Sequence, residues 1–162
     1  MSPTDRRRDV LDSLGRAIVT GEMTPGQSLT LEAIQSRYGV SRTLARDCVH
    51  ALESVGVVTS RRRVGIVVLP REHWSALTPQ LVRWQLEADP HGPTLGALTE
   101  LRAAIEPVAA AAAARRATEE QRSGLLALAA TIHTKGTTGN VASYLDDDIA
   151  FHRLILEASH ND

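Results

Sequence analysis

The most constraining feature of this chain is a short turn, Tyr38-Gly39-Val40-Ser41, that lies between two helical patterns. Glycine tolerates the positive φ that ends a helix, and a serine hydroxyl accepts hydrogen bonds from the free amides that begin the next helix. The pattern therefore predicts two helices that meet at a sharp corner.

The helix after this turn has one apolar and one basic face. The predicted apolar stripe takes a residue from each turn of the helix: Leu44 or Ala45, Cys48 or Val49, Leu52, and Val55. Arg42, Arg46 and His50 lie on another face. Because Arg42, Thr43 and Arg46 fall in the first turn and a half, they occupy the place where a recognition helix meets the DNA major groove. An ordinary solvated helix face is the alternative.

A basic hairpin follows this helix. Residues 57–60 and 64–68 are short β-branched runs, and Arg61-Arg62-Arg63 joins them, so three cations lie at the hairpin tip. Such a tip suits a minor groove or the phosphate backbone. Helix, turn, basic helix and basic hairpin in this order predict a winged helix-turn-helix that binds DNA.

The distribution of charge and of cysteine agrees with this prediction. Residues 1–70 carry ten Lys+Arg against seven Asp+Glu, whereas residues 71–162 carry eight against twelve, so the positive half is the half expected to meet DNA. The single cysteine, Cys48, excludes an internal disulfide and favours the reduced cytoplasm. No apolar tract approaches the roughly 20 residues that a bilayer requires, so no membrane association is expected.

Beyond Pro70 the strand signals stop. Helical patterns cover residues 72–87, 95–116, 118–133 and 140–159, and the segments 89–93 and 135–139 separate them. One apolar stripe is expected to pack in a helical bundle: Leu98, Leu101, Ile105, Val108 and Ala112. The predicted fold is mainly α, with a winged helix-turn-helix domain at 1–70 and part of an all-helical domain at 71–162.

The first domain resembles the DNA-binding domain of the GntR family of bacterial transcription regulators, from Ile18 to Val68. The matching residues are Gly21, Pro25, Gly26, Leu29, Val40, Ser41, Arg42, Thr43, Arg46, Leu52, Gly56, Val57, Val58 and Gly65. The resemblance implies a double-stranded DNA operator as the partner. The implied operator contacts are Ser41, Arg42, Thr43, Arg46, Arg61, Arg62, Arg63 and Gly65. The chain departs from the family where Ala33 follows Glu32 and where Leu44 replaces a common proline.

The second domain resembles the start of the helical FCD effector domain found in the FadR branch of that family. The resemblance rests on residues 100–107, an alanine-rich helix, and Asp148-x-x-x-His152. It implies that Asp148 and His152 are two ligands of a divalent metal such as zinc or nickel, and that Arg102 reaches a small carboxylate or sugar-acid effector. From spacing alone, an Asp148–His152 ion pair and an Arg102–Glu106 ion pair are the alternatives.

The family's domain continues for several helices that supply two more histidine ligands, so the chain is expected to be either a fragment or a shortened regulator. The combined interpretation is a cytoplasmic, homodimeric regulator, a repressor, whose affinity for a palindromic operator is controlled by an effector. Two rivals are a metal-dependent enzyme and a module that uses the winged helix for protein contacts. No catalytic serine triad or phosphate-binding loop is recognisable, and the arginines oppose a protein-contact role.

Overall fold

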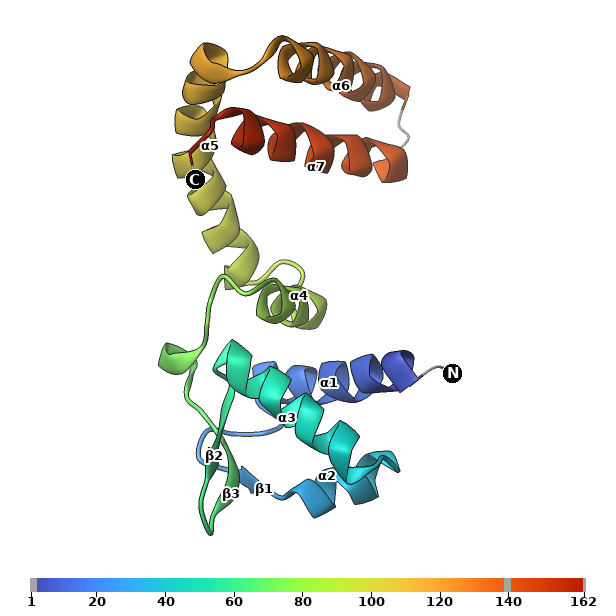
Figure 1. The fold of residues 1–162 in the computed structure, drawn as a ribbon, viewed down its shortest axis with the longest axis vertical. Helices are drawn as coiled ribbons and strands as arrows, with labels where there is room; N and C mark the ends of the chain where they lie inside the picture. The colour runs from blue at the N-terminus through green and yellow to red at the C-terminus, as the bar shows by residue number, and fades with distance from the viewer. Residues whose placement is uncertain (1–2, 139–140, 162) are drawn as a thin grey trace. The chain divides into compact units, whose positions relative to one another are not determined.

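The computed structural model describes residues 3–138 and 141–161 and confirms the mainly helical fold class (Figure 1). The chain divides into two compact units, Met1–Gly96 and Ala97–Asp162. The sequence places the end of the first domain at residue 70, whereas the first compact unit continues through Gly96. None of the helices in the described part combines the length and hydropathy that a bilayer crossing requires.

Three helices form the body of the first unit: α1 (Pro3–Val19), α2 (Leu31–Tyr38) and α3 (Arg42–Val55). The predicted turn lies between α2 and α3, because Gly39 ends α2 in the left-handed region with a φ of 61°. The predicted apolar stripe of α3 is buried. These buried residues of α3 belong to one continuous core of the first unit. The whole core consists of Val10, Leu14, Ala17, Ile18, Val19, Met23, Ile34, Ala45, Cys48, Val49, Leu52, Val55, Val57, Val58, Ile66, Val68, Leu81 and Trp84.

The hairpin is part of a three-stranded antiparallel sheet in the order β1-β3-β2. Strand β2 (Val58–Arg61) pairs with β3 (Gly65–Val68), and the short β1 (Ser28–Leu29) covers the other side of β3. The predicted hairpin is therefore confirmed within a residue at each end. Strand β2 is left at an edge of the sheet, beside α3.

A helix that the sequence assigns to the second domain packs in the first unit. Helix α4 (Pro79–Ala88) contacts α1, and its Trp84 and Leu81 are fully buried in the core of that unit. The buried carboxylate of Asp12 accepts hydrogen bonds from the side chains of Gln80, Arg83 and Trp84, the last at 2.9 Å. Packing and hydrogen bonding thus join α4 to α1.

The prediction of a helix over 72–87 is wrong at its start. A 3-10 turn (Arg71–His73) precedes α4, and the helix itself begins at Pro79 after an extended Thr78 with a ψ of 124°. The residue before a proline avoids the helical region, and proline suits the first position of a helix, so both preferences delay the start.

The second unit contains most of α5 (Pro93–Arg116), then α6 (Glu119–Thr138) and α7 (Val141–Ala158), and α6 lies beside α7 (Figure 1). The predicted break at 135–139 is wrong for its first part, because α6 continues through Gly136 to Thr138. A single glycine costs a helix only about 1 kcal/mol, less than packing along a neighbouring helix supplies.

The predicted apolar stripe of α5 is largely uncovered among the described residues. Leu101, Ile105 and Val108 are 37%, 46% and 69% exposed, and the buried positions of α5 are alanines. Ala113 and Ala117 form a small buried cluster with Ala158 at the end of α7. The buried contact between the end of α5 and α7 is therefore made by small side chains, and the larger apolar residues of α5 stay partly exposed.

Candidate nucleic-acid interface

The N-terminus of α3 presents the predicted contact residues. Ser41 caps the helix, and its hydroxyl accepts a hydrogen bond from the Leu44 N–H at 3.2 Å. This cap fixes the first turn, from which Arg42, Thr43 and Arg46 extend with exposed side chains. Exposed guanidinium groups on the first turns of a capped helix are the arrangement that reads guanine or binds phosphate.

Glu32 forms an ion pair with one of these arginines, Arg42. Its Oε1 lies 2.9 Å from Nη1 of Arg42, so the first turn of α2 orients a side chain of the first turn of α3. The pKa of Glu32 is lowered, first by hydrogen bonding from its own backbone N–H and then by the charge of Arg42 and the hydroxyl of Thr30. The sequence does not predict this role, because Glu32 and Arg42 belong to different helices.

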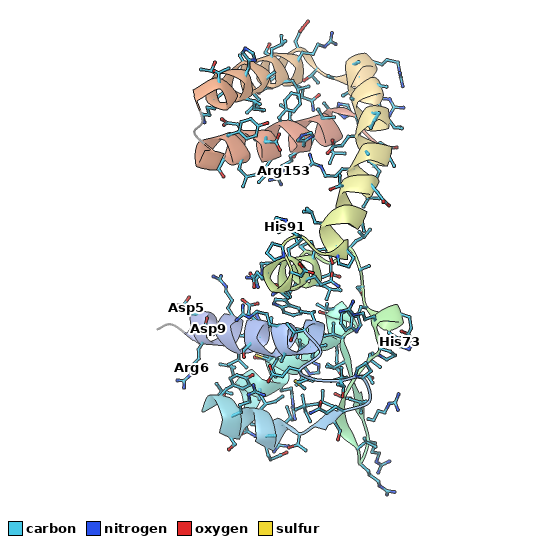
Figure 2. All side chains as sticks on the ribbon, turned by 180° about the vertical axis from the view of Figure 1, so that it is seen from behind. Asp5, Arg6, Asp9, His73, His91 and Arg153 are labelled. Carbon is cyan, nitrogen blue, oxygen red and sulfur yellow. The ribbon has the colours of Figure 1, made fainter. Side chains whose placement is uncertain are left out.

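The hairpin tip carries Arg61, Arg62 and Arg63, and its side chains project beyond the strands (Figure 2). Two residues adopt positive φ there, Arg63 at 65° and Gly65 at 104°. A Cβ on Gly65 would lie 2.5 Å from the backbone oxygen of Leu29, so the close approach of β1 to β3 requires glycine.

A hollow of about 360 Å³ separates the hairpin from the starts of α2 and α3. Its walls combine residues of the two helix starts with residues of the hairpin: Thr30, Leu31, Glu32, Arg42, Ser60, Arg61, Arg63, Val64, Gly65 and Ile66. The structure thus brings Arg42, Arg61, Arg63 and Gly65 to one surface. Arg62 lies on the same hairpin but does not line the hollow.

Glu53, in the last turns of α3, joins this helix to the hairpin. Its Oε1 accepts a hydrogen bond from the backbone N–H of Ser60 at 2.7 Å, and its Oε2 lies 3.2 Å from Nδ1 of His50. The pKa of Glu53 is lowered, chiefly because Ser60 hydrogen-bonds to the carboxylate through its hydroxyl and its backbone. The sequence does not predict this contact of Glu53, because a lone glutamate on a helix carries no signal of its distant partner.

The predicted effector and metal residues meet around Glu106 in the second unit. Oε1 of Glu106 accepts a hydrogen bond from Nε of Arg102 at 2.6 Å and lies 3.2 Å from Nδ1 of His152. Nε2 of His152 lies 3.5 Å from Oδ1 of Asp148. The ion-pair geometry that spacing offered as the alternative is therefore present for both pairs.

Within the described residues this arrangement does not complete a metal site, and the role of Asp148 and His152 as metal ligands stays a prediction. The two carboxylates lie against opposite ring nitrogens of His152, so they do not converge on a shared point beside one nitrogen. Within the described residues, no group of three or more His, Cys, Asp or Glu side chains could hold a metal ion.

A larger hollow of about 590 Å³ lies on α5 and α7 of the second unit. Its lining combines apolar side chains, two arginines and two further polar residues: Ala104, Ile105, Val108, Ala109, Ala112, Arg115, Arg116, Leu156, Ser159 and Asn161. Arg116 donates to the backbone oxygen of Ser159 at 2.9 Å. Arg102 is absent from this lining, and the sequence does not predict a role here for Arg115 or Arg116.

Comparison with known proteins identifies both halves of the chain. Residues 6–68 match the family described as bacterial regulatory proteins, gntR family, and residues 97–162 match the FCD domain. The chain belongs to the GntR family. A GntR regulator with an FCD domain is a DNA-binding transcriptional regulator and not an enzyme, so the resemblance inferred from the sequence is confirmed and the enzymatic alternative is excluded.

Relatives agree with this assignment. The GntR chain is 29% identical over 163 residues to the galactonate operon transcriptional repressor of Escherichia coli K12. The match covers 99% of this chain and 69% of the relative. It is 30% identical over 151 residues to YieP, an HTH-type transcriptional regulator of the same strain, with coverages of 93% and 66%. The chain thus spans about two thirds of the length of these relatives.

A solved structure shares the fold. The structure of Lar, described as controlling the expression of the Listeria monocytogenes agr system and mediating virulence, matches with a TM-score of 0.53 and 19% identity. The match covers 96% of this chain and 64% of that chain. At this identity the likeness shows the fold alone.

Proposed function

We propose that this GntR regulator is a repressor of the FadR branch, which acts in the cytoplasm as a homodimer on a palindromic operator. The observation that carries the proposal is the capped start of α3, where Arg42 and Arg46 are exposed beside a hairpin with three arginines. In this proposal α3 enters the major groove and the hairpin contacts the phosphate backbone or the minor groove.

The proposed division of labour follows from the chemistry of the side chains. Arg42 and Arg46 have planar, forked donors that match guanine O6 and N7, and Thr43 and Ser41 supply hydroxyls for a phosphate or a base. The hairpin arginines contribute mainly through charge, because counterions are released when phosphates are neutralised. Salt dependence therefore separates the two contributions.

We further propose that the second unit binds a small carboxylate, such as a sugar acid, and thereby changes operator affinity. A relative named as a galactonate operon repressor supports a sugar acid. Arg102 remains our proposed clamp, because its Nε bond to Glu106 leaves four of the five guanidinium N–H donors for a carboxylate. No step of this proposal uses a metal, since Asp148 and His152 do not form a metal site with the described residues.

The test is fluorescence-anisotropy titration with DNA from the promoter region next to the gene, at two salt concentrations about fourfold apart. Each bidentate arginine–guanine contact is worth about 1 to 3 kcal/mol, so the double variant Arg42→Ala/Arg46→Ala should bind the operator roughly 30-fold or more weakly. Arg153→Ala is the matched control, because it removes an exposed arginine from the second unit. Equal binding by the double variant and the parent protein would overturn the assignment of α3 as the recognition helix.

The effector proposal is tested in the same titration. Addition of galactonate or a related sugar acid should weaken operator binding by the parent protein, and Arg102→Ala should abolish that response without changing operator affinity in its absence. A response that Arg102→Ala retains in full would remove Arg102 from the effector site.

A further inference from the structure

The hydrogen bond between Glu53 and Ser60 closes an exposed edge of the sheet. Strand β2 is an edge strand, so alternate backbone N–H groups point away from β3 and lack a partner within the sheet. The N–H of Ser60 is one of these groups, and it donates to Oε1 of Glu53 at 2.7 Å. A carboxylate acceptor makes this bond stronger than an ordinary backbone pair, in agreement with the short distance.

The position of this bond matters because it lies between the two elements proposed to touch DNA. Glu53 belongs to α3, and Ser60 immediately precedes the arginines of the hairpin tip. The base of the hairpin is fixed by the core, through Val58 and Val68, which are 2% and 1% exposed. On β2 and the tip, residues 60–64 are exposed and lack that support, whereas Ile66, which pairs with Ser60 on β3, is buried. A bond at Ser60 therefore constrains β2 at the point where its own side chains no longer pack in the core.

We propose that Glu53 is a positioning residue for DNA recognition: its carboxylate fixes the basic hairpin against the recognition helix, so that both fit one operator half-site together. This inference rests on the proposed function, since it assumes that α3 and the hairpin both contact the operator. His50, 3.2 Å from the second oxygen of Glu53, orients the carboxylate from the α3 side. The free protein thus holds the hairpin in its binding orientation and avoids the entropy cost of ordering it on DNA.

The first experiment measures the bond in the free protein by amide hydrogen exchange, read by NMR. The Ser60 amide should exchange at least about tenfold more slowly in the parent protein than in Glu53→Ala, because only the parent supplies an acceptor. Glu53→Gln keeps a neutral acceptor and should retain part of the protection. Asp47→Ala is the matched control: it removes another carboxylate from α3, and none of the hydrogen bonds of the described residues joins Asp47 to the hairpin. Ser60 protection that is unchanged in Glu53→Ala would overturn the proposal.

The second experiment is a double-mutant cycle in operator binding, with Arg62→Ala/Arg63→Ala as the hairpin variant. If Glu53 acts through the hairpin, Glu53→Ala should weaken binding about tenfold in the parent background but less than about twofold in the hairpin variant. The salt dependence of Glu53→Ala should also fall, by about 0.9 in the log–log slope for each phosphate that the hairpin no longer neutralises. A merely structural loss would weaken both backgrounds equally, and that result would overturn the inference.

The two experiments separate the inference from the function on which it rests. If the parent protein does not bind promoter DNA, the proposed function fails, whereas the exchange of Ser60 still reports whether the bond forms. If the parent binds with the expected salt dependence and Glu53→Ala behaves like Asp47→Ala, the regulator assignment stands and the positioning role of Glu53 is refuted. Should Glu53→Ala fold poorly, Glu53→Gln completes the same cycle, with a smaller expected coupling of the same sign.

Discussion

Gly15 offers a test of the packing between α1 and α4. It lies in the interior of α1, where an alanine would normally stabilise a helix by about 1 kcal/mol. A Cβ at this position, however, would lie 2.4 Å from Cδ2 and Cε2 of Trp84 and 2.5 Å from Cζ2. Trp84 is fully buried, so its ring has no free space into which it can move.

The magnitude follows from three contributions. Overpacking of a core costs about 1 to 3 kcal/mol. Displacement of the indole weakens its 2.9 Å bond to the buried carboxylate of Asp12, a loss of about 1 to 3 kcal/mol if the bond breaks. After the gain in helix propensity of about 1 kcal/mol is subtracted, Gly15→Ala should lower the free energy of unfolding by roughly 1 to 5 kcal/mol if the bond breaks.

The assay is urea unfolding followed by tryptophan fluorescence, because both tryptophans, Trp74 and Trp84, lie in the first unit. Gly96→Ala is the control, since a Cβ there meets no atom within 4 Å, and it should be neutral or stabilising. In a Trp84→Leu background the penalty of Gly15→Ala should largely disappear. A Gly15→Ala protein as stable as the parent would refute the close packing of α4 on α1.

Three further outcomes are expected. Ser41→Ala removes the cap of the recognition helix and should cost about 1 kcal/mol in urea unfolding, and Ser41→Asp should restore it. The buried Cys48 thiol has a pKa raised by burial, so iodoacetamide should alkylate it slowly in the native protein and rapidly in urea, as mass spectrometry would show. The pKa of Glu53 is lowered from 4.5, so its contribution to stability is complete above 4.5 and is lost as pH falls through the lowered value; Glu53→Gln should flatten that part of the acid unfolding curve.

The elements that sequence reasoning found are those with local signals. Gly39 and Ser41 mark the corner between α2 and α3 because a positive φ and a side-chain cap are properties of single residues. The buried stripe of α3 follows from spacing alone, and so do the two strands around the arginine tip. For the same reason the predicted contact residues of α3 and the hairpin could be named without a structure.

The features that it missed depend on contacts between distant residues. Asp12 and Trp84 are 72 positions apart, and the spacing of residues in α1 and α4 does not show that these two side chains are in contact. The sequence alone therefore places α4 in the second domain. Glu53 and Ser60 belong to different elements, so their bond has no periodic signature. On α5 the apolar spacing predicts the helix correctly, but it does not say which face a neighbouring helix covers, and alanines are the residues that pack.

The packing of α4 also decides where this protein can be divided. A DNA-binding domain cut after Val68, where the match to the gntR family ends, would lack Leu81 and Trp84 and would expose the groove of α1 around Gly15 that the indole fills. It would also leave the carboxylate of Asp12 without the side chains of Gln80, Arg83 and Trp84 that donate to it. A domain that ends after Ala88 keeps these partners, and it is the shortest piece expected to fold alone.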